Sequence, residues 1–253
     1  MTLPSFNLAG KVALVTGCNT GLGQAMAIAL AEAGADVVGI NRSAPTEAEK
    51  AIKAAGRKFY DLRADVGQID KLAGLVSQAV ELAGRIDILV NNAGIIRRND
   101  SIDFTEKDWD DVMDVNLKSV FFLSQAAARQ FIAQGQGGKI INIASMLSFQ
   151  GGIRVPSYTS SKSGVLGLTK IMANEWAKHG INVNAIAPGY MDTNNTEAIR
   201  ADAQRNAEIL GRIPAGRWGL PEDMAGPVVF LASQASNYLQ GHTMAVDGGW
   251  LAR

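Results

Sequence analysis

The stretch VALVTGCNTGLG, residues 12–23, decides the fold class of this chain. A short apolar run, Val12–Thr16, passes through a turn with glycines at 17, 21 and 23 into a segment of helical period near Leu22. A strand, a glycine-rich turn and a helix in this order aim backbone N–H groups and the positive helix end at a pyrophosphate. Glycine suits the turn because a Cβ would block the approaching phosphates. The spacing is G-x3-G-x-G rather than G-x-G-x-x-G, so an ordinary glycine-rich turn is the alternative.

The same alternation of short and long segments continues outward from this stretch. The short runs are almost wholly apolar, as expected for strands that are covered on both faces. They alternate with segments of helical period, which predicts an α/β fold: a Rossmann-type, doubly wound, parallel sheet of seven strands with helices on both faces. The predicted strands are Val12–Thr16, Asp36–Ile40, Phe59–Ala64, Ile86–Asn91, Lys139–Ala144, Asn182–Ala187 and Thr243–Val246. The predicted helices are Leu22–Ala33, Thr46–Ala55, Ile69–Leu82, Glu106–Ala133, Ser157–Lys178 and Pro221–Ser233.

The domain organisation follows from what does not interrupt this alternation. The sequence contains no Pro/Gly/Ser linker, composition shift or internal repeat, so we predict one domain over residues 1–253. The stretch 189–214 is the one long connection whose pattern indicates no element. It follows a strand end, which is where active-site loops and lids lie.

Composition and charge exclude several classes of protein. Of the 253 residues 47% are hydrophobic and 19% charged, which is typical of a globule with a large core and not of a disordered chain. The 24 basic and 24 acidic residues predict no nucleic-acid partner. No apolar stretch approaches the ~20 residues that span a bilayer, and no basic and apolar leader is visible at the start. One cysteine and two histidines offer no metal site, and the lone cysteine fits a reducing compartment, so we expect a cytoplasmic protein.

Tyr158 is the only one of the four tyrosines with a lysine four residues on, Lys162. Both residues fall in a predicted helix, where this spacing places them on one face. A neighbouring ammonium favours the phenolate and would lower a phenol pKa from about 10 toward working pH. Such a group can exchange a proton with an alcohol or carbonyl. Ser145 follows a strand at the carboxyl edge of the sheet, where it could orient a substrate oxygen, or it could simply cap a turn, as Ser148 also could.

Six motifs occur together and in order along the whole chain: TGCNTGLG, NNAG at residues 91–94, DVNL with Asn116, Ser145, YTSSK at 158–162 and PGYMDT at 188–193. This set resembles that of the short-chain dehydrogenase/reductase family. The resemblance implies a nicotinamide-dependent oxidoreductase with a catalytic tetrad of Asn116, Ser145, Tyr158 and Lys162. It also implies that Lys162 holds the nicotinamide ribose and that Asn116 supports a water-linked proton relay.

The resemblance further implies a set of cofactor contacts and an assembly. Asn91 and Gly94 would lie along the cofactor, and Thr193 near its carboxamide and phosphates. A homotetramer would pack residues 106–133 and 157–178 across subunits, although the apolar run in the first segment fits an intrachain core equally well. The implied cofactor-binding residues are Gly17, Asn19, Thr20, Gly21, Leu22, Gly23, Asn41, Arg42, Asp65, Val66, Asn92, Ala93, Gly94, Tyr158, Lys162, Pro188, Gly189, Met191 and Thr193.

The end of the second predicted strand bears on the choice between NAD and NADP. An acidic residue there would bind the adenine-ribose hydroxyls and repel a 2′-phosphate. This chain has Asn41, which carries no charge, followed by Arg42. Arg42 could pair with a 2′-phosphate or point into solvent. The residues leave both cofactors open, and we expect NAD, with NADP possible, through the resemblance described next.

Three longer stretches, at residues 143–159, 172–196 and 212–224, resemble family members that act on sugar acids. The implied reaction transfers hydride between NAD(H) and the C5 carbonyl of a 3-deoxy-2-keto sugar acid, in the breakdown of uronate polymers such as pectin. A reductase of gluconate-type ketones or of 3-oxoacyl thioesters is the alternative enzyme. A nucleotide-sensing scaffold is the alternative outside catalysis, and it has no need of Tyr158 with Lys162.

A mixed polar pocket with one cation suits a small anionic polyol. We expect Arg154 to pair with the substrate carboxylate, because it lies between Ser145 and Tyr158; a surface arginine is the alternative. Arg97 and Arg98 offer a second cationic element, or a solvated pair. The expected substrate-binding residues are Ser145, Gln150, Arg154, Tyr158 and Tyr190, with Met146 and Ser148 at the mouth.

Overall fold

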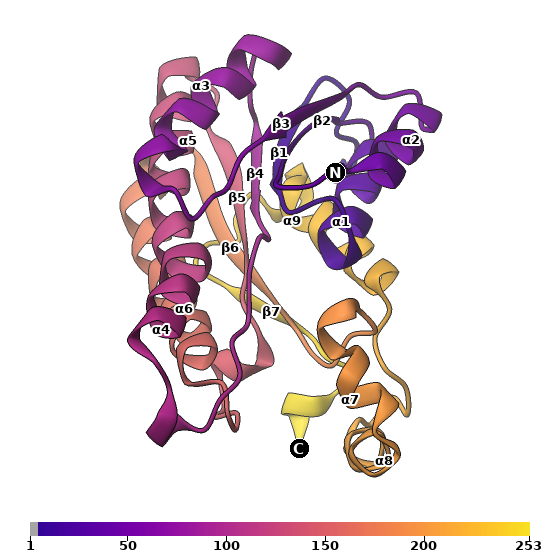
Figure 1. Ribbon diagram of the computed structural model, residues 1–253. Helices are drawn as coiled ribbons and strands as arrows, with labels where there is room; N and C mark the ends of the chain where they lie inside the picture. Colours follow the sequence, from indigo (N-terminus) through magenta and orange to yellow (C-terminus); the bar gives the residue numbers. More distant parts are fainter. Residues whose placement is uncertain (1–4) are drawn as a thin grey trace.

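The computed structural model describes residues 5–253 and contains one parallel sheet with the strand order β3-β2-β1-β4-β5-β6-β7. The first strand, β1, therefore lies inside the sheet, between β2 and β4, and the chain winds outward from it in both directions (Figure 1). This confirms the predicted doubly wound α/β fold. The strands are β1 (Val12–Thr16), β2 (Asp36–Asn41), β3 (Phe59–Arg63), β4 (Ile88–Asn91), β5 (Gly138–Ile143), β6 (Ile181–Pro188) and β7 (Thr243–Val246).

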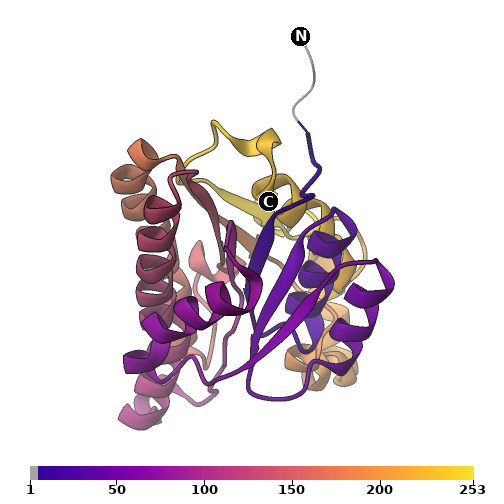
Figure 2. The same ribbon diagram turned by 90° about the horizontal axis from the view of Figure 1, so that it is seen from above.

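Helices cover both faces of the sheet, as Figure 2 shows from above. One layer consists of α1 (Gly21–Glu32), α2 (Thr46–Ala54) and α9 (Ala225–Ala232). The other contains α3 (Leu72–Ala83), α5 (Ser119–Gln134) and α6 (Pro156–Trp176), with α4 (Glu106–Met113) beside α6. Two short helices, α7 (Glu197–Ala201) and α8 (Ala203–Arg212), lie apart from both layers, near the C-terminus (Figure 1). No helix within residues 5–253 is long and apolar enough to cross a membrane.

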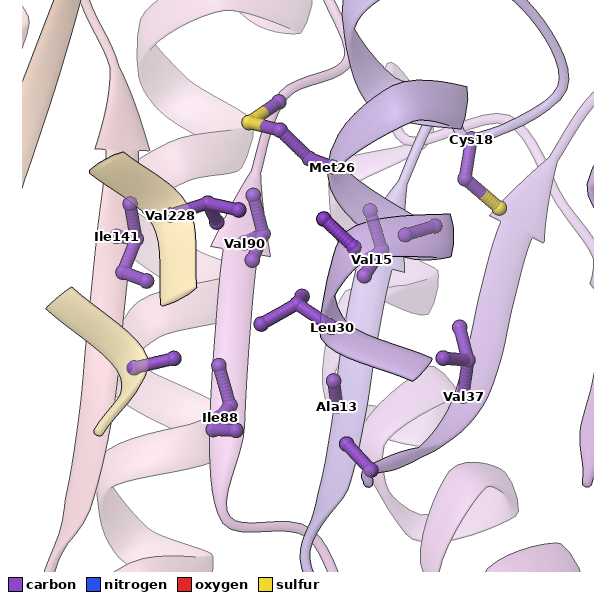
Figure 3. Packing of buried hydrophobic residues seen from close by; sticks show 14 of the residues in the cluster. Ala13, Val15, Cys18, Met26, Leu30, Val37, Ile88, Val90, Ile141 and Val228 are labelled. Carbon is purple, nitrogen blue, oxygen red and sulfur yellow. The ribbon is translucent and has the colours of Figure 1, made fainter. Parts of the chain in front are cut away.

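The sheet separates the two largest apolar clusters of the core. In the first, Met26 and Leu30 of α1 pack onto Val15 of β1 and Val90 of β4, beside Val228 of α9 (Figure 3). The second cluster joins the opposite faces of these strands to α3, α5 and α6. Burying one such aliphatic side chain stabilises the fold by about 1.5–3 kcal/mol. The near-continuous apolar strands predicted from the sequence arise because the five inner strands pack on both sides, whereas the edge strands β3 and β7 are partly exposed.

The structure corrects the predicted helix Glu106–Ala133. It is two helices, α4 and α5, joined by a wider π-helical turn over Asp114–Lys118. Such turns recur at functional sites, and this one contains the buried Asn116. A smooth helical period could not reveal it, because one inserted residue hardly changes the spacing of the apolar residues.

Other boundaries differ by smaller amounts. Ile69–Lys71 form a 3-10 turn before α3 begins at Leu72, and Pro221–Met224 form another before α9. The stretch 189–214, for which no element was predicted, contains α7 and α8. Part of the N-terminal stretch in which no leader was seen, residues 1–4, lies outside the described residues.

Candidate active site

The carboxyl ends of the central strands open onto a cleft of about 630 Å³. Its walls include the turns after β1 and β4, which are neighbours in the sheet but not in the sequence. Ligands of open α/β sheets bind where the strand order reverses in this way. Apart from Asn91, the structure brings the residues predicted to bind the cofactor into these walls: Gly17, Asn19, Thr20, Gly21, Leu22, Gly23, Asn41, Arg42, Asp65, Val66, Asn92, Ala93, Gly94, Tyr158, Lys162, Pro188, Gly189, Met191 and Thr193.

The glycine-rich turn has a backbone that other residues would not tolerate. Gly17 and Gly21 have φ values of 67° and 56°, in the left-handed region that favours glycine. A Cβ on Gly23 would lie 2.1 Å from the carbonyl oxygen of Gly17, so α1 can begin this close to the turn only with glycine there. The turn therefore presents bare backbone and the start of α1 to the cleft.

Asn92 ties the end of β4 to this turn. Its Nδ2 donates to the carbonyl oxygens of Thr16 and Gly17, both at 3.0 Å, while the Thr16 hydroxyl accepts from the backbone of Asn92 at 3.0 Å and of Ala93 at 2.9 Å. Asn91 differs from the prediction that it lies along the cofactor. It is buried away from the cleft, and its Nδ2 donates to Ser124 and Asn142.

At the end of β2, Asn41 is almost wholly buried in the cleft wall. Its Nδ2 donates to the Sγ of Cys18 at 3.4 Å, and its Oδ1 has no hydrogen-bond partner among the described residues. A buried acceptor without a donor is costly. A ribose hydroxyl would satisfy it. Arg42 and Ser43 follow in the same wall.

Ser145, Tyr158 and Lys162 meet in the cleft. Ser145 follows β5 and caps a short turn, where its hydroxyl accepts from the backbone N–H of Leu147 at 3.1 Å. Tyr158 and Lys162 project from one face of α6, with the ammonium 5.7 Å from the centre of the phenol ring. The Lys162 Nζ donates to the carbonyl oxygen of Ile143 at 2.6 Å, which holds it at the end of β5.

Ser148 connects the loop after β5 to α6. Its hydroxyl donates to the carbonyl oxygen of Lys162 at 2.7 Å and accepts from the backbone N–H of Ser145 at 3.2 Å. The capping alternative considered for Ser145 and Ser148 is therefore real for both, and it coexists with the position of Ser145 in the cleft wall.

The electrostatics of the pair differ from the prediction. Burial raises the pKa of Tyr158, while a hydrogen bond to Ser145 and the positive charge of Arg98 lower it. Lys162 is not among these causes. Burial also lowers the pKa of Lys162 itself from 10.5 to about 8. The low-dielectric surroundings thus disfavour the charged form of each group, as expected for buried titratable side chains.

The side chain of Asn116 hydrogen-bonds the backbone of Ile95. From the π-helical turn, its Oδ1 accepts from the N–H of Ile95 at 2.8 Å and its Nδ2 donates to the carbonyl oxygen of Ile95 at 2.9 Å. A weaker contact reaches the hydroxyl of Ser161 at 3.4 Å. This wholly buried side chain does not line the cleft; it holds Ile95, which does. Its predicted part in a proton relay stays a prediction.

The segment after β6 forms the wall that sequence reasoning described least. Arg200 of α7 pairs with Asp192 at 2.6 Å and donates to the carbonyl oxygen of Thr193 at 3.3 Å, which joins α7 to the loop. The helices of this segment are too short to produce a recognisable helical period of apolar residues in the sequence. The residues missed here are Asp192, Asn194, Asn195, Thr196, Arg200 and Pro221.

Three of the predicted substrate residues lie outside the cleft wall. Arg154, at a φ of 63°, pairs with Asp100 at 3.0 Å in an exposed loop. Gln150 accepts from Arg212 at 3.5 Å. Tyr190 packs edge-on against Trp218 and Trp250 next to a separate, smaller cavity. Only Ser145 and Tyr158 of this set line the cleft.

This arrangement matches a known family. Residues 17–251 match the family model described as Enoyl-(Acyl carrier protein) reductase, and a relative from Escherichia coli (strain K12) is 70% identical over the full length of both chains. The chain belongs to the short-chain dehydrogenase/reductase family. That relative is named 2-dehydro-3-deoxy-D-gluconate 5-dehydrogenase.

Two solved structures of the family superimpose closely. One from Agrobacterium tumefaciens, with bound NADP and provisionally named a 2-deoxy-D-gluconate 3-dehydrogenase, is 60% identical with a TM-score of 0.92, covering 98% of this chain and 99% of its own. A gluconate 5-dehydrogenase from Burkholderia cenocepacia J2315, in complex with NADP and tartrate, is 39% identical with a TM-score of 0.93, covering 98% of each chain.

The cleft of this short-chain dehydrogenase/reductase fits a nicotinamide dinucleotide on its own geometry. The turn 17–23 offers phosphates a backbone cradle, and Asn41 offers a ribose an unpartnered acceptor. Lys162 supplies an ammonium beside Tyr158. When bound, the cofactor supplies the hydride and the protein supplies the proton.

Proposed function

We propose that this protein is an NAD(P)-dependent dehydrogenase that interconverts the C5 ketone and C5 alcohol of a 3-deoxy-2-keto sugar acid. One observation carries the proposal: Ser145, Tyr158 and Lys162 share one cleft in a chain that is 70% identical, end to end, to a relative named for this reaction. The uncharged Asn41 and the neighbouring Arg42 fit either dinucleotide, and we propose NAD as the usual one.

The residues of the cleft divide the work of the reaction. Ser145 lowers the pKa of Tyr158 and lines the same cleft, so the two hydroxyls can hold one substrate oxygen between them. Burial keeps Tyr158 protonated at neutral pH, and the phenol can then give its proton to the carbonyl oxygen as the carbon is reduced. Alcohol oxidation uses the same steps in reverse and needs the phenolate, so it is favoured at higher pH. Lys162, held by Ile143, binds the ribose hydroxyls and fixes the cofactor against Tyr158.

The assembly and location are part of the same proposal. Apolar side chains remain partly exposed on the helical layer that contains α4, α5 and α6: Trp109 of α4, Phe122 and Ile132 of α5, and Ile171 of α6. Such exposure on one layer is typical of a subunit interface. We propose a homotetramer in which these helices pack across subunits, working in the cytoplasm on acids released from uronate polymers such as pectin.

A substrate screen tests the proposed function. The protein is assayed with NADH and NADPH in parallel against 3-deoxy-2,5-diketohexonate, 5-ketogluconate and a 3-oxoacyl thioester. Consumption of the reduced cofactor is followed by absorbance at 340 nm, and a typical enzyme turnover is about 10 s⁻¹. We expect the highest kcat/KM with the deoxy diketo acid. A preference for the thioester would contradict the proposal, and a preference for 5-ketogluconate would move the assignment to the gluconate-type reaction.

Two variants test what selects the cofactor. Asn41→Asp adds a charge that repels a 2′-phosphate, so the NADH/NADPH ratio of kcat/KM should rise; Arg42→Ala should lower activity with NADPH. Position 41 is buried beside Cys18, so a carboxylate there costs stability, and thermal unfolding is measured alongside. Unchanged ratios in two folded variants would place the selection elsewhere in the loop.

A further inference from the structure

Arg98 is not itself a wall residue of the cleft, but it lies beside one. It lies in the loop that follows β4, and its Nη2 donates to the carbonyl oxygen of Asn195 at 3.0 Å. Asn195 belongs to the segment after β6 that forms the opposite wall. The guanidinium therefore joins two segments that are far apart in the sequence and that each contribute residues to the cleft wall.

The charge of Arg98 is not neutralised by an acidic side chain. Within residues 5–253 it forms no ion pair, whereas its neighbour Arg97 contacts Asp108 and Asp111, each at 3.4 Å. Arg154, the arginine expected from the sequence, is paired with Asp100. Among the described residues, a backbone carbonyl alone contacts the Arg98 guanidinium, so several of its donors remain for a ligand.

Arg98 is also close enough to the reacting group to act on it. Its positive charge lowers the pKa of Tyr158. Lys162, the other cation beside Tyr158, is buried and held by Ile143. An anion bound near Tyr158 would therefore find Arg98 as its free cation.

The substrate proposed above carries an anion on the same short carbon chain as its reacting ketone. Four carbon–carbon bonds separate the C5 carbonyl from the C1 carboxylate, so the carboxylate extends a few ångströms beyond the reacting carbon. We propose that Arg98 binds this carboxylate as a two-point pair and thereby selects the ketone that presents its oxygen to Tyr158. A guanidinium fork matches a carboxylate in this way, and the pairing fixes orientation as well as adding affinity. The proposal rests on the proposed function, because it needs an acid substrate.

Kinetics of three variants test this role. Arg98→Ala should lower kcat/KM for the diketo acid about ten- to a hundredfold, the loss expected for a charge-assisted pair, mainly through KM. The methyl ester of the same acid, which lacks the charge, should lose little. Arg98→Lys should recover only part of the activity, since a point charge cannot reproduce the fork. Arg97→Ala is the matched control and should stay within about threefold, because its ion pairs are exposed.

Binding without turnover gives a second readout. Calorimetric titration of the diketo acid into enzyme saturated with NAD⁺ forms a complex in which both partners are oxidised, so no reaction occurs. Arg98→Ala should weaken this dissociation constant about ten- to a hundredfold, and Arg97→Ala should not.

The outcomes separate the two proposals. If the parent enzyme uses the diketo acid but Arg98→Ala loses equally on acid and ester, Arg98 merely holds the loop and the inference is overturned. A larger selective loss in Arg154→Ala would return the role to Arg154. A parent enzyme that neither binds nor reduces the acid overturns the proposed function, and the role of Arg98 with it.

Discussion

Tyr158→Phe should lower kcat by roughly 10²–10⁴-fold while leaving NADH affinity near the parent value. The variant keeps the ring that packs in the cleft wall and removes only the hydroxyl that Ser145 contacts. Because Lys162 is held by Ile143 and not by Tyr158, the proposed ribose contact should survive. Steady-state kinetics in both directions and fluorescence titration with NADH measure the two quantities.

The pH dependence adds a second reading of the same residue. Burial raises the pKa of Tyr158, so the phenol stays protonated through neutral pH and ketone reduction should be sustained there. Oxidation requires the phenolate and should increase as the pH rises toward that pKa. The residual activity of Tyr158→Phe should lack this rise. A variant with near-parent turnover, or with an unchanged profile, would contradict a proton-transfer role for Tyr158.

Lys162→Met should weaken NADH binding about ten- to a hundredfold at neutral pH, the loss of one charge-assisted interaction. Burial lowers the pKa of Lys162 to about 8, so the parent ammonium is charged below pH 8 and neutral above it. The parent dissociation constant should therefore be flat below pH 8 and rise above it. That of Lys162→Met should be raised at all pH values and nearly flat. Fluorescence titrations with NADH on both sides of pH 8 measure these dissociation constants. A parent affinity that does not change with pH would contradict a role of the Lys162 ammonium in cofactor binding.

Stability provides the control for that variant. The unfolded chain binds a proton at Lys162 up to a pKa of 10.5, whereas the folded chain releases it near pH 8. Between these values the unfolded state holds more protons, so this group makes the parent more stable as the pH rises. Below pH 8, Lys162→Met avoids the cost of a buried charge and should be at least as stable as the parent. Denaturant unfolding at pH 7 and pH 10 checks this, and shows that weakened binding is not loss of fold.

Local regularities along the chain determined most of the fold and much of the cleft. The period of the apolar residues predicted seven strands and their parallel, doubly wound arrangement, and β1 and β7 have the predicted bounds. The glycines at 17, 21 and 23 marked the turn that the backbone geometry requires. A spacing of four on α6 placed Tyr158 and Lys162 on one face. These features depend only on residues that are close together in the sequence, so they can be predicted from the sequence alone.

Only the tertiary structure decided which groups pair and what each environment does to a charge. In the folded protein, Asn116 lies in a π-helical turn and hydrogen-bonds the backbone of Ile95. Arg154 forms an ion pair with Asp100. The tertiary structure also set Arg98 against Asn195, ninety-seven positions away, and made burial rather than Lys162 the main influence on the pKa of Tyr158. Desolvation and charge compensation depend on which distant segments meet, and no local pattern contains that information.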